Sequence, residues 1–108
     1  MDQAKAEILI HLARQAIYCV DRGQMIVMLI DQDQPWNNPG ILDLYKSLHK
    51  SKYIRKKKVL GSWTYQLSKR GWKRLTEGQR QDMLDEYIEW KERIQPTIDG
   101  PEWLEWIE

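Results

Sequence analysis

Residues 39–67 read PGILDLYKSLHKSKYIRKKKVLGSWTYQL, and this stretch decides the fold class. The first part, residues 39–51, repeats apolar residues at helical spacing, which predicts a helix with one apolar and one polar face. A lysine-rich turn containing Gly61 then joins two short strand-like segments. In the second of these, Trp63, Tyr65 and Leu67 alternate with polar residues. The stretch therefore predicts a helix followed by a β-hairpin.

Further helices flank this centre. Residues 4–21 repeat apolar side chains at helical spacing and precede the stop signal Arg22-Gly23. The apolar run 25–30 is a short helix or a strand, and its pattern does not decide between them. Ser68 is a predicted N-cap after the hairpin, and a capping box at residues 76–79 predicts that the last helix breaks or restarts near Gly78. We expect a mostly α-helical chain with a small β-hairpin, an α+β fold.

The charges are segregated along the chain although the net charge of the 108 residues is only +1. Residues 46–76 hold eleven lysines and arginines and no aspartate or glutamate, whereas residues 77–108 hold ten acidic and three basic residues. Such a pattern indicates an anionic partner for the middle segment, and the alternative is a solvated basic face. We divide the chain into residues 1–76 and an acidic segment, residues 77–108, within one compact domain.

Several classes of protein are excluded by composition. The longest apolar run has six residues, far below the ~20 that span a bilayer, and the N-terminus lacks the pattern of a signal peptide. Cys19 is the single cysteine, and His11 and His49 lie far apart without further ligands at metal spacing. No phosphate-binding glycine loop or nucleophile motif is present. We expect a cytoplasmic protein that is not an enzyme, with no metal, cofactor or membrane partner.

Residues 44–75 resemble the winged helix-turn-helix family of DNA-binding regulators, in its PadR-like and MarR-like branches. The residues that carry this resemblance are Leu48, Tyr53-Ile54, Gly61, Tyr65-Gln66-Leu67-Ser68, Gly71 and Leu75. The resemblance implies that residues 39–51 form a recognition helix in the major groove and residues 55–61 form the wing. It also implies a long C-terminal dimerisation helix.

The expected DNA-binding residues lie on the polar face of the recognition helix, on the wing and at the start of the following helix. Exposed helical side chains reach base edges in the major groove, and lysines suit backbone phosphates. For the wing lysines the alternative is a charged edge that resists strand pairing. The expected residues are Asp43, Lys46, Ser47, His49, Lys50, Lys52, Arg55, Lys56, Lys57, Lys58, Lys69, Arg70, Lys73 and Arg74.

An apolar seam runs along the predicted C-terminal helix, and a Trp-rich tail follows it. For the helix we expect a two-fold interface between copies, since a small domain has limited core to offer, and the alternative is that the helix folds back and completes the chain's own core. For the tail, an interface and packing on the chain's own core both stay open. The expected interface residues are Met83, Leu84, Tyr87, Trp90, Ile94, Trp103 and Trp106.

The sequence thus predicts a small homodimeric transcriptional regulator that binds double-stranded DNA. One alternative is a winged-helix adaptor that docks on a protein partner through its Trp-rich acidic tail. Another is an RNA-binding module in which Trp63 or Trp36 stacks on bases.

Overall fold

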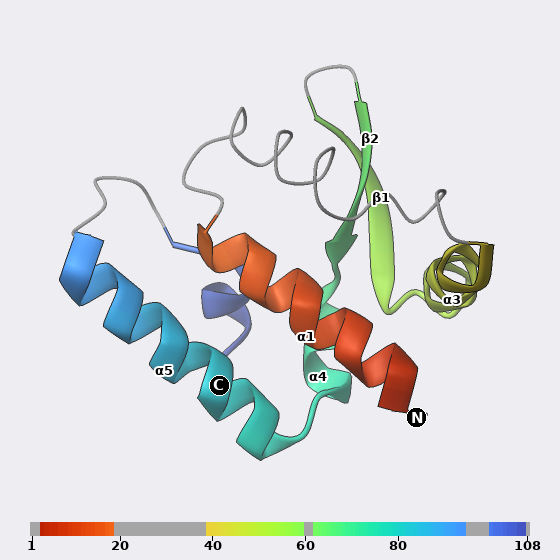
Figure 1. Ribbon diagram of the computed structural model, residues 1–108. Helices are drawn as coiled ribbons and strands as arrows, with labels where there is room; N and C mark the ends of the chain where they lie inside the picture. Colours follow the sequence, from red (N-terminus) through yellow and green to blue (C-terminus); the bar gives the residue numbers. More distant parts are fainter. Residues whose placement is uncertain (1–2, 19–38, 60–61, 95–99, 108) are drawn as a thin grey trace.

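The computed structural model describes residues 3–18, 39–59, 62–94 and 100–107 (Figure 1). Its elements in chain order are α1 (Gln3–Tyr18), α3 (Pro39–Lys50), β1 (Ile54–Val59), β2 (Ser62–Leu67), α4 (Lys69–Arg74), α5 (Glu77–Ile94) and the 3-10 helix η2 (Glu102–Trp106). The expected α+β class, mostly helical with a small hairpin, is confirmed. The apolar run 25–30, Cys19, Trp36 and the hairpin turn at Gly61 lie outside the described residues.

Helix α1 supplies the centre of the core. Its side chains at helical spacing, Leu9, Leu12, Ala13 and Ile17, are all buried. The helix contacts α3, β2, α4 and α5, so the other elements assemble around it (Figure 1). Burial of one apolar stripe by four neighbours explains why a helix of moderate length is stable here, since tertiary packing contributes most of a helix's stability.

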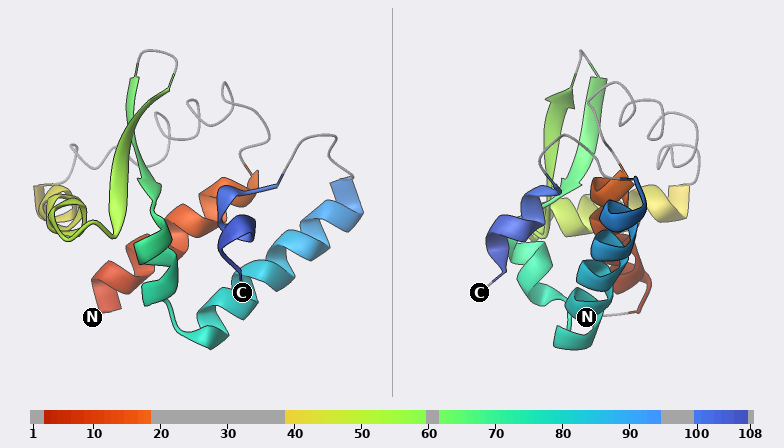
Figure 2. Two further views of the ribbon diagram at one scale, coloured as in Figure 1. Left: turned by 180° about the vertical axis from the view of Figure 1, so that it is seen from behind. Right: turned by 90° about the vertical axis from the view of Figure 1, so that its left-hand side faces the viewer.

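The two strands pair in antiparallel fashion, with Ile54 opposite Leu67 and Lys56 opposite Tyr65. Ile54, Tyr65 and Leu67 are buried, so one face of the hairpin base belongs to the core. Thr64, predicted to face the other way, is buried too, and its hydroxyl donates to the carbonyl of Lys57 at 3.0 Å. Figure 2 shows the hairpin extending away from the helices, with α3 at its base.

Local hydrogen bonds set the helix boundaries after the hairpin, as predicted. The Ser68 hydroxyl accepts from the Gly71 amide at 3.1 Å and caps α4. At the start of α5 the Gln79 amide donates to the Thr76 hydroxyl at 3.1 Å, and the Thr76 amide donates to the Gln79 side chain at 2.9 Å. The predicted break thus falls between Arg74 and Glu77.

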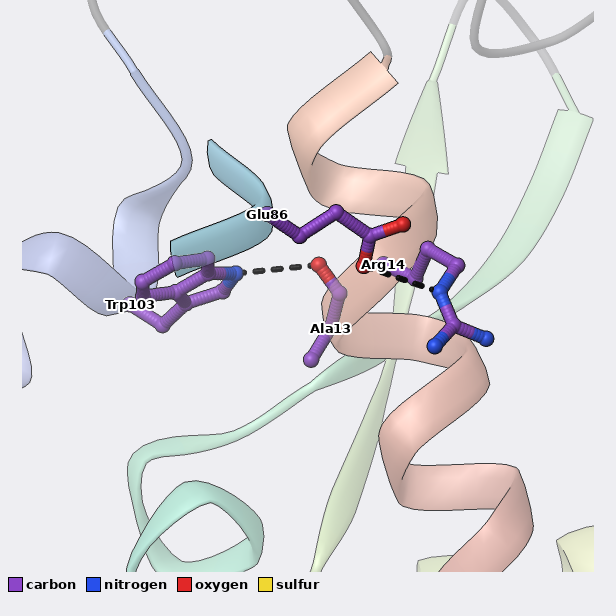
Figure 3. Close-up of polar contacts among 4 residues, drawn as sticks. All are labelled: Ala13, Arg14, Glu86 and Trp103. Atoms are coloured by element: carbon purple, nitrogen blue, oxygen red, sulfur yellow. Dashed lines mark hydrogen bonds and ion pairs between the residues drawn. The ribbon is translucent and has the colours of Figure 1, made fainter. Parts of the chain in front are cut away.

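The C-terminal segment packs on the core of its own chain. The Trp103 ring stacks on Trp72 with centroids 4.6 Å apart and meets Tyr87 edge-on at 6.2 Å. Its indole nitrogen donates to the carbonyl of Ala13 at 3.0 Å (Figure 3). The same figure shows the ion pair of Arg14 with Glu86, 3.0 Å long, which joins α1 to α5. Both contacts hold the acidic segment against α1.

These contacts correct the expected dimer interface. Met83, Tyr87, Trp90 and Trp103 are 3%, 7%, 9% and 1% exposed within one chain, so the seam is part of the monomer's core. The seam is therefore not available for the expected two-fold interface, because α1 and η2 of the same chain cover it. Leu84 and Trp106 are half-buried, and the side chain of Ile94 lies outside the described residues. A homodimer as such stays a prediction.

Candidate nucleic-acid interface

The outer face of α3 carries the polar side chains that the helical pattern placed there. Asp43, Lys46, His49 and Lys50 are exposed, and Ser47 is half-buried. On the inner face Tyr45 and Leu48 are buried. Ile41, predicted to face inward, is 41% exposed, because a helical pattern fixes the direction of a side chain but not how far the neighbouring surface extends.

The hairpin presents three consecutive lysines, Lys56, Lys57 and Lys58, all exposed. Because side chains alternate along a strand, Lys56 shares a face with Tyr65, and Lys57 projects from the opposite face with its cross-strand partner Thr64. The Lys56 ammonium lies 5.6 Å from the centroid of the Tyr65 ring. Two lysines that are neighbours in sequence therefore point in different directions.

Tyr65 joins the hairpin to the polar side of α3. Its ring lies 5.1 Å from Tyr45, and His49 meets it edge-on at 6.1 Å. Together with Lys56 on the hairpin, His49 on α3 thus borders the same aromatic ring. The arrangement brings one polar side chain from each of the two elements to this ring.

The turn between α3 and β1 is fixed from both sides. The Tyr53 amide donates to the Leu48 carbonyl and the Lys52 amide to the His49 carbonyl, each at 3.0 Å, a Schellman arrangement in which Lys52 adopts a φ of 66°. From the N-cap of α4, the Ser68 hydroxyl donates to the Lys52 carbonyl at 2.7 Å. The geometry holds Lys52 exposed at the end of α3.

Helix α4 adds cations beside this turn. The Arg70 guanidinium lies 5.2 Å from the centroid of Tyr53, and Lys69 next to it is exposed. Gly71 allows the close approach, since a β-carbon there would lie 2.0 Å from the Tyr53 carbonyl oxygen. The turn and the start of α4 therefore present their basic side chains together. Lys73 and Arg74 further along α4 are exposed as well.

Arg55 has a different environment from the other predicted residues. Its guanidinium forms an ion pair with Glu102 of η2 and donates to the Gln66 side chain at 3.4 Å. Because a carboxylate of the same chain occupies it, Arg55 is less available to a phosphate than its position in the sequence suggests. Sequence reasoning missed this pair because 47 positions separate its members.

Apart from Arg55, few of the predicted DNA-binding lysines and arginines form an ion pair with a carboxylate of the acidic segment. Among the described residues, Lys46, Lys50, Lys52, Lys57 and Lys69 form no ion pair.

The described ranges contain neither a group of three potential metal ligands nor a helix long and apolar enough to cross a membrane. Comparison of the chain with protein-family models, with curated proteins and with solved structures found no match.

Proposed function

We propose that this chain is a winged helix-turn-helix protein that binds double-stranded DNA and acts as a transcriptional regulator. In this proposal the outer face of α3 enters the major groove, and the lysines of the hairpin contact the phosphate backbone. The order α1, α3, hairpin, α4 supports it, and so does the position of α3 at the base of the hairpin (Figure 2).

The observation that carries the proposal is the convergence of α3 and the hairpin on Tyr65. Helix α3 contributes His49 and the hairpin contributes Lys56 to the same ring, so the polar face of the helix lies beside one face of the hairpin. A helix flanked by cations suits a groove bordered by phosphates, because the helix reaches base edges while the cations fix its register.

The charge balance supports an anionic partner. Twelve of the fourteen predicted residues are exposed, and eleven of these are basic or histidine. The exception, Asp43, can accept a hydrogen bond from a cytosine amino group. Binding of this kind releases counterions, so the affinity should fall with salt with a log–log slope of about −0.9 per phosphate contacted.

The two neighbouring lysines of β1 allow a sharp test. Lys56→Ala and Lys57→Ala remove the same charge, but Lys56 lies over Tyr65 toward α3 and Lys57 lies on the opposite face. We expect Lys56→Ala to weaken duplex binding more and to reduce the salt slope by about 1. Fluorescence anisotropy with a random duplex over a range of salt concentrations measures both.

Lys91→Ala is the matched control, because Lys91 is exposed on α5, which lies across α1 from α3 (Figure 1). It should leave the slope unchanged. Equal effects of all three substitutions would contradict the proposed surface. Tighter binding to single-stranded RNA than to duplex DNA would remove α3 from the major groove and favour the RNA alternative. An absence of salt-dependent binding to either would contradict the function.

A further inference from the structure

A carboxylate of the C-terminal segment occupies an arginine at the base of the hairpin. Glu102 on η2 forms an ion pair with the guanidinium of Arg55 on β1, and the same guanidinium donates to the Gln66 side chain at 3.4 Å. Arginine binds carboxylate and phosphate through the same planar fork of N–H groups. A phosphate that approaches Arg55 therefore meets a fork that already holds an anion.

Packing of the neighbouring residue keeps Glu102 in this position. Trp103, which follows it in η2, is 1% exposed, stacks on Trp72 and donates to the carbonyl of Ala13 (Figure 3). Because η2 is fixed on the core in this way, the carboxylate beside Trp103 stays close to β1. A tethered carboxylate acts at a high effective concentration, so it competes well with an external anion.

The same carboxylate also repels an approaching phosphate. The side chain of Glu102 is 48% exposed and that of Arg55 is 37% exposed, so the pair lies at the surface. Like charges repel at close range, although salt screens the effect. Exchange of Glu102 for a phosphate gains little in addition, because the guanidinium holds one anion before the exchange and one after it.

The pair lies on one particular face of the hairpin. Side chains alternate along β1, so Arg55 and Lys56 project from opposite faces. Lys56 lies over Tyr65 on the side of α3, whereas Arg55 lies beside its cross-strand partner Gln66 and faces η2. Glu102 thus neutralises a cation on the face turned away from Tyr65. This favours the side next to α3 as the side that the duplex meets.

We propose that Glu102 masks Arg55 from nucleic-acid phosphate, so that Arg55 makes no phosphate contact in the complex with duplex DNA and the C-terminal segment limits the affinity of the chain. This masking rests on the proposed function, because the masked arginine belongs to the hairpin that contacts the backbone. It adds a regulatory contact within one chain, in which an acidic residue of η2 controls a basic residue of β1.

Glu102→Gln tests the masking, because it removes the charge and keeps the shape of the side chain. We expect it to tighten binding to a random duplex by about two- to fivefold at moderate salt, the range of one exposed ionic contact. The log–log salt slope should become steeper by about 0.9, because the released Arg55 contacts one more phosphate. Fluorescence anisotropy over a range of salt concentrations measures both.

The gain must depend on Arg55. Arg55→Gln alone should leave the salt slope of the wild type unchanged, and the double variant of Arg55→Gln and Glu102→Gln should lose the gain. Glu105→Gln is the matched control, because Glu105 is exposed on the same helix and forms no ion pair within the described ranges. It removes the same charge and should change the slope little.

Three results would overturn the masking. A gain that persists without Arg55, or that Glu105→Gln reproduces, would be a general effect of charge. A shallower slope of Arg55→Gln alone would show that the duplex already displaces Glu102. Weaker binding of Glu102→Gln would show that the pair positions Arg55 for the duplex.

An NMR measurement without DNA separates failure of the masking from failure of the proposed function. The Nε atom of Arg55 is buried, so its N–H exchanges slowly with water and gives an observable signal. The chemical shift of this signal should change with Glu102→Gln and stay the same with Glu105→Gln. An unchanged shift with Glu102→Gln would overturn the pair, whatever the duplex does. A changed shift without binding of any variant to duplex would overturn the proposed function and the masking with it.

Discussion

Lys52 stands at a backbone position that favours glycine. Its φ of 66° follows from the Schellman arrangement that ends α3, and a side chain in this left-handed region costs roughly 1–2 kcal/mol. The chain nevertheless places an exposed lysine there, between two basic elements. Residues with a strained backbone tend to occur at functional sites. A lysine at this strained position is therefore consistent with a binding role for its charge.

Lys52→Gly should therefore change stability and binding in opposite directions. We expect the free energy of unfolding to rise by about 0.5–1 kcal/mol, because glycine adopts this φ without strain. Duplex affinity should fall together with the salt slope, because one phosphate contact is lost. Urea unfolding and anisotropy measure the two effects.

Lys50→Gly is the control for this prediction. Lys50 is exposed at the helical end of α3, so glycine there should lower stability by up to about 1 kcal/mol. A Lys52→Gly protein that loses stability would contradict the strain argument. One that binds duplex as tightly as the wild type would exclude Lys52 from the interface.

At the scale of elements, the contact between α4 and the α3–β1 turn depends on Gly71. The carbonyl oxygen of Tyr53 occupies the space where a β-carbon would stand, and the side chain of Leu67 lies 2.9 Å from that point. The backbone of the turn and the start of α4 thus touch directly. This contact sets the position of the basic side chains on α4 relative to those at the end of α3.

Gly71→Ala and Gly78→Ala form a matched pair. The first should destabilise the fold by about 3 kcal/mol, because a backbone carbonyl must move. The second should raise stability by up to about 1 kcal/mol, because Gly78 lies in the exposed first turn of α5 with open space around it. Thermal unfolding of both proteins measures the difference. Equal stabilities would contradict the close packing at Gly71.

At the scale of the whole molecule, the acidic C-terminal segment is part of the core rather than a separate docking arm. Trp103 joins η2 to α1 and α4, and Glu86 joins α5 to α1. The segment also delivers Glu102 to Arg55 at the first strand of the hairpin. The described part of the acidic segment therefore packs against the rest of the chain.

Trp90→Ala tests the assignment of the α5 seam to the monomer's core. Because Trp90 is buried, we expect a loss of about 3–5 kcal/mol in unfolding free energy. The control is Ile88→Ser on the same helix, which should cost little because Ile88 is 43% exposed.

Sedimentation at matched concentration accompanies the unfolding measurements. The mass should be the same for wild type and for Trp90→Ala wherever the variant is folded. A stable wild-type dimer that Trp90→Ala separates into folded monomers would contradict the burial of the seam within one chain. A dimer separated by Ile88→Ser instead would place the interface on the outer face of α5.

The sequence by itself determined the elements whose causes are local. The helix predicted at residues 39–51 is present as Pro39–Lys50, and the strand at residues 62–67 and the caps at Ser68 and Thr76 lie where they were predicted. Each depends on hydrogen bonds or side-chain spacing within a few residues, and such short-range causes are visible in the sequence.

Only the tertiary structure decided what each apolar face is buried against. The apolar repeat in α5 predicts that Met83, Tyr87 and Trp90 are buried, and they are. The same repeat would be expected whether a second copy or the chain's own α1 and η2 covered these side chains. The environments of Arg55 and Gln15 also depend on the tertiary structure. Arg55 pairs with a carboxylate 47 positions away, and the amide nitrogen of Gln15 is buried without an acceptor. A periodic pattern specifies that a surface is covered, and the partner depends on contacts between residues far apart in the chain.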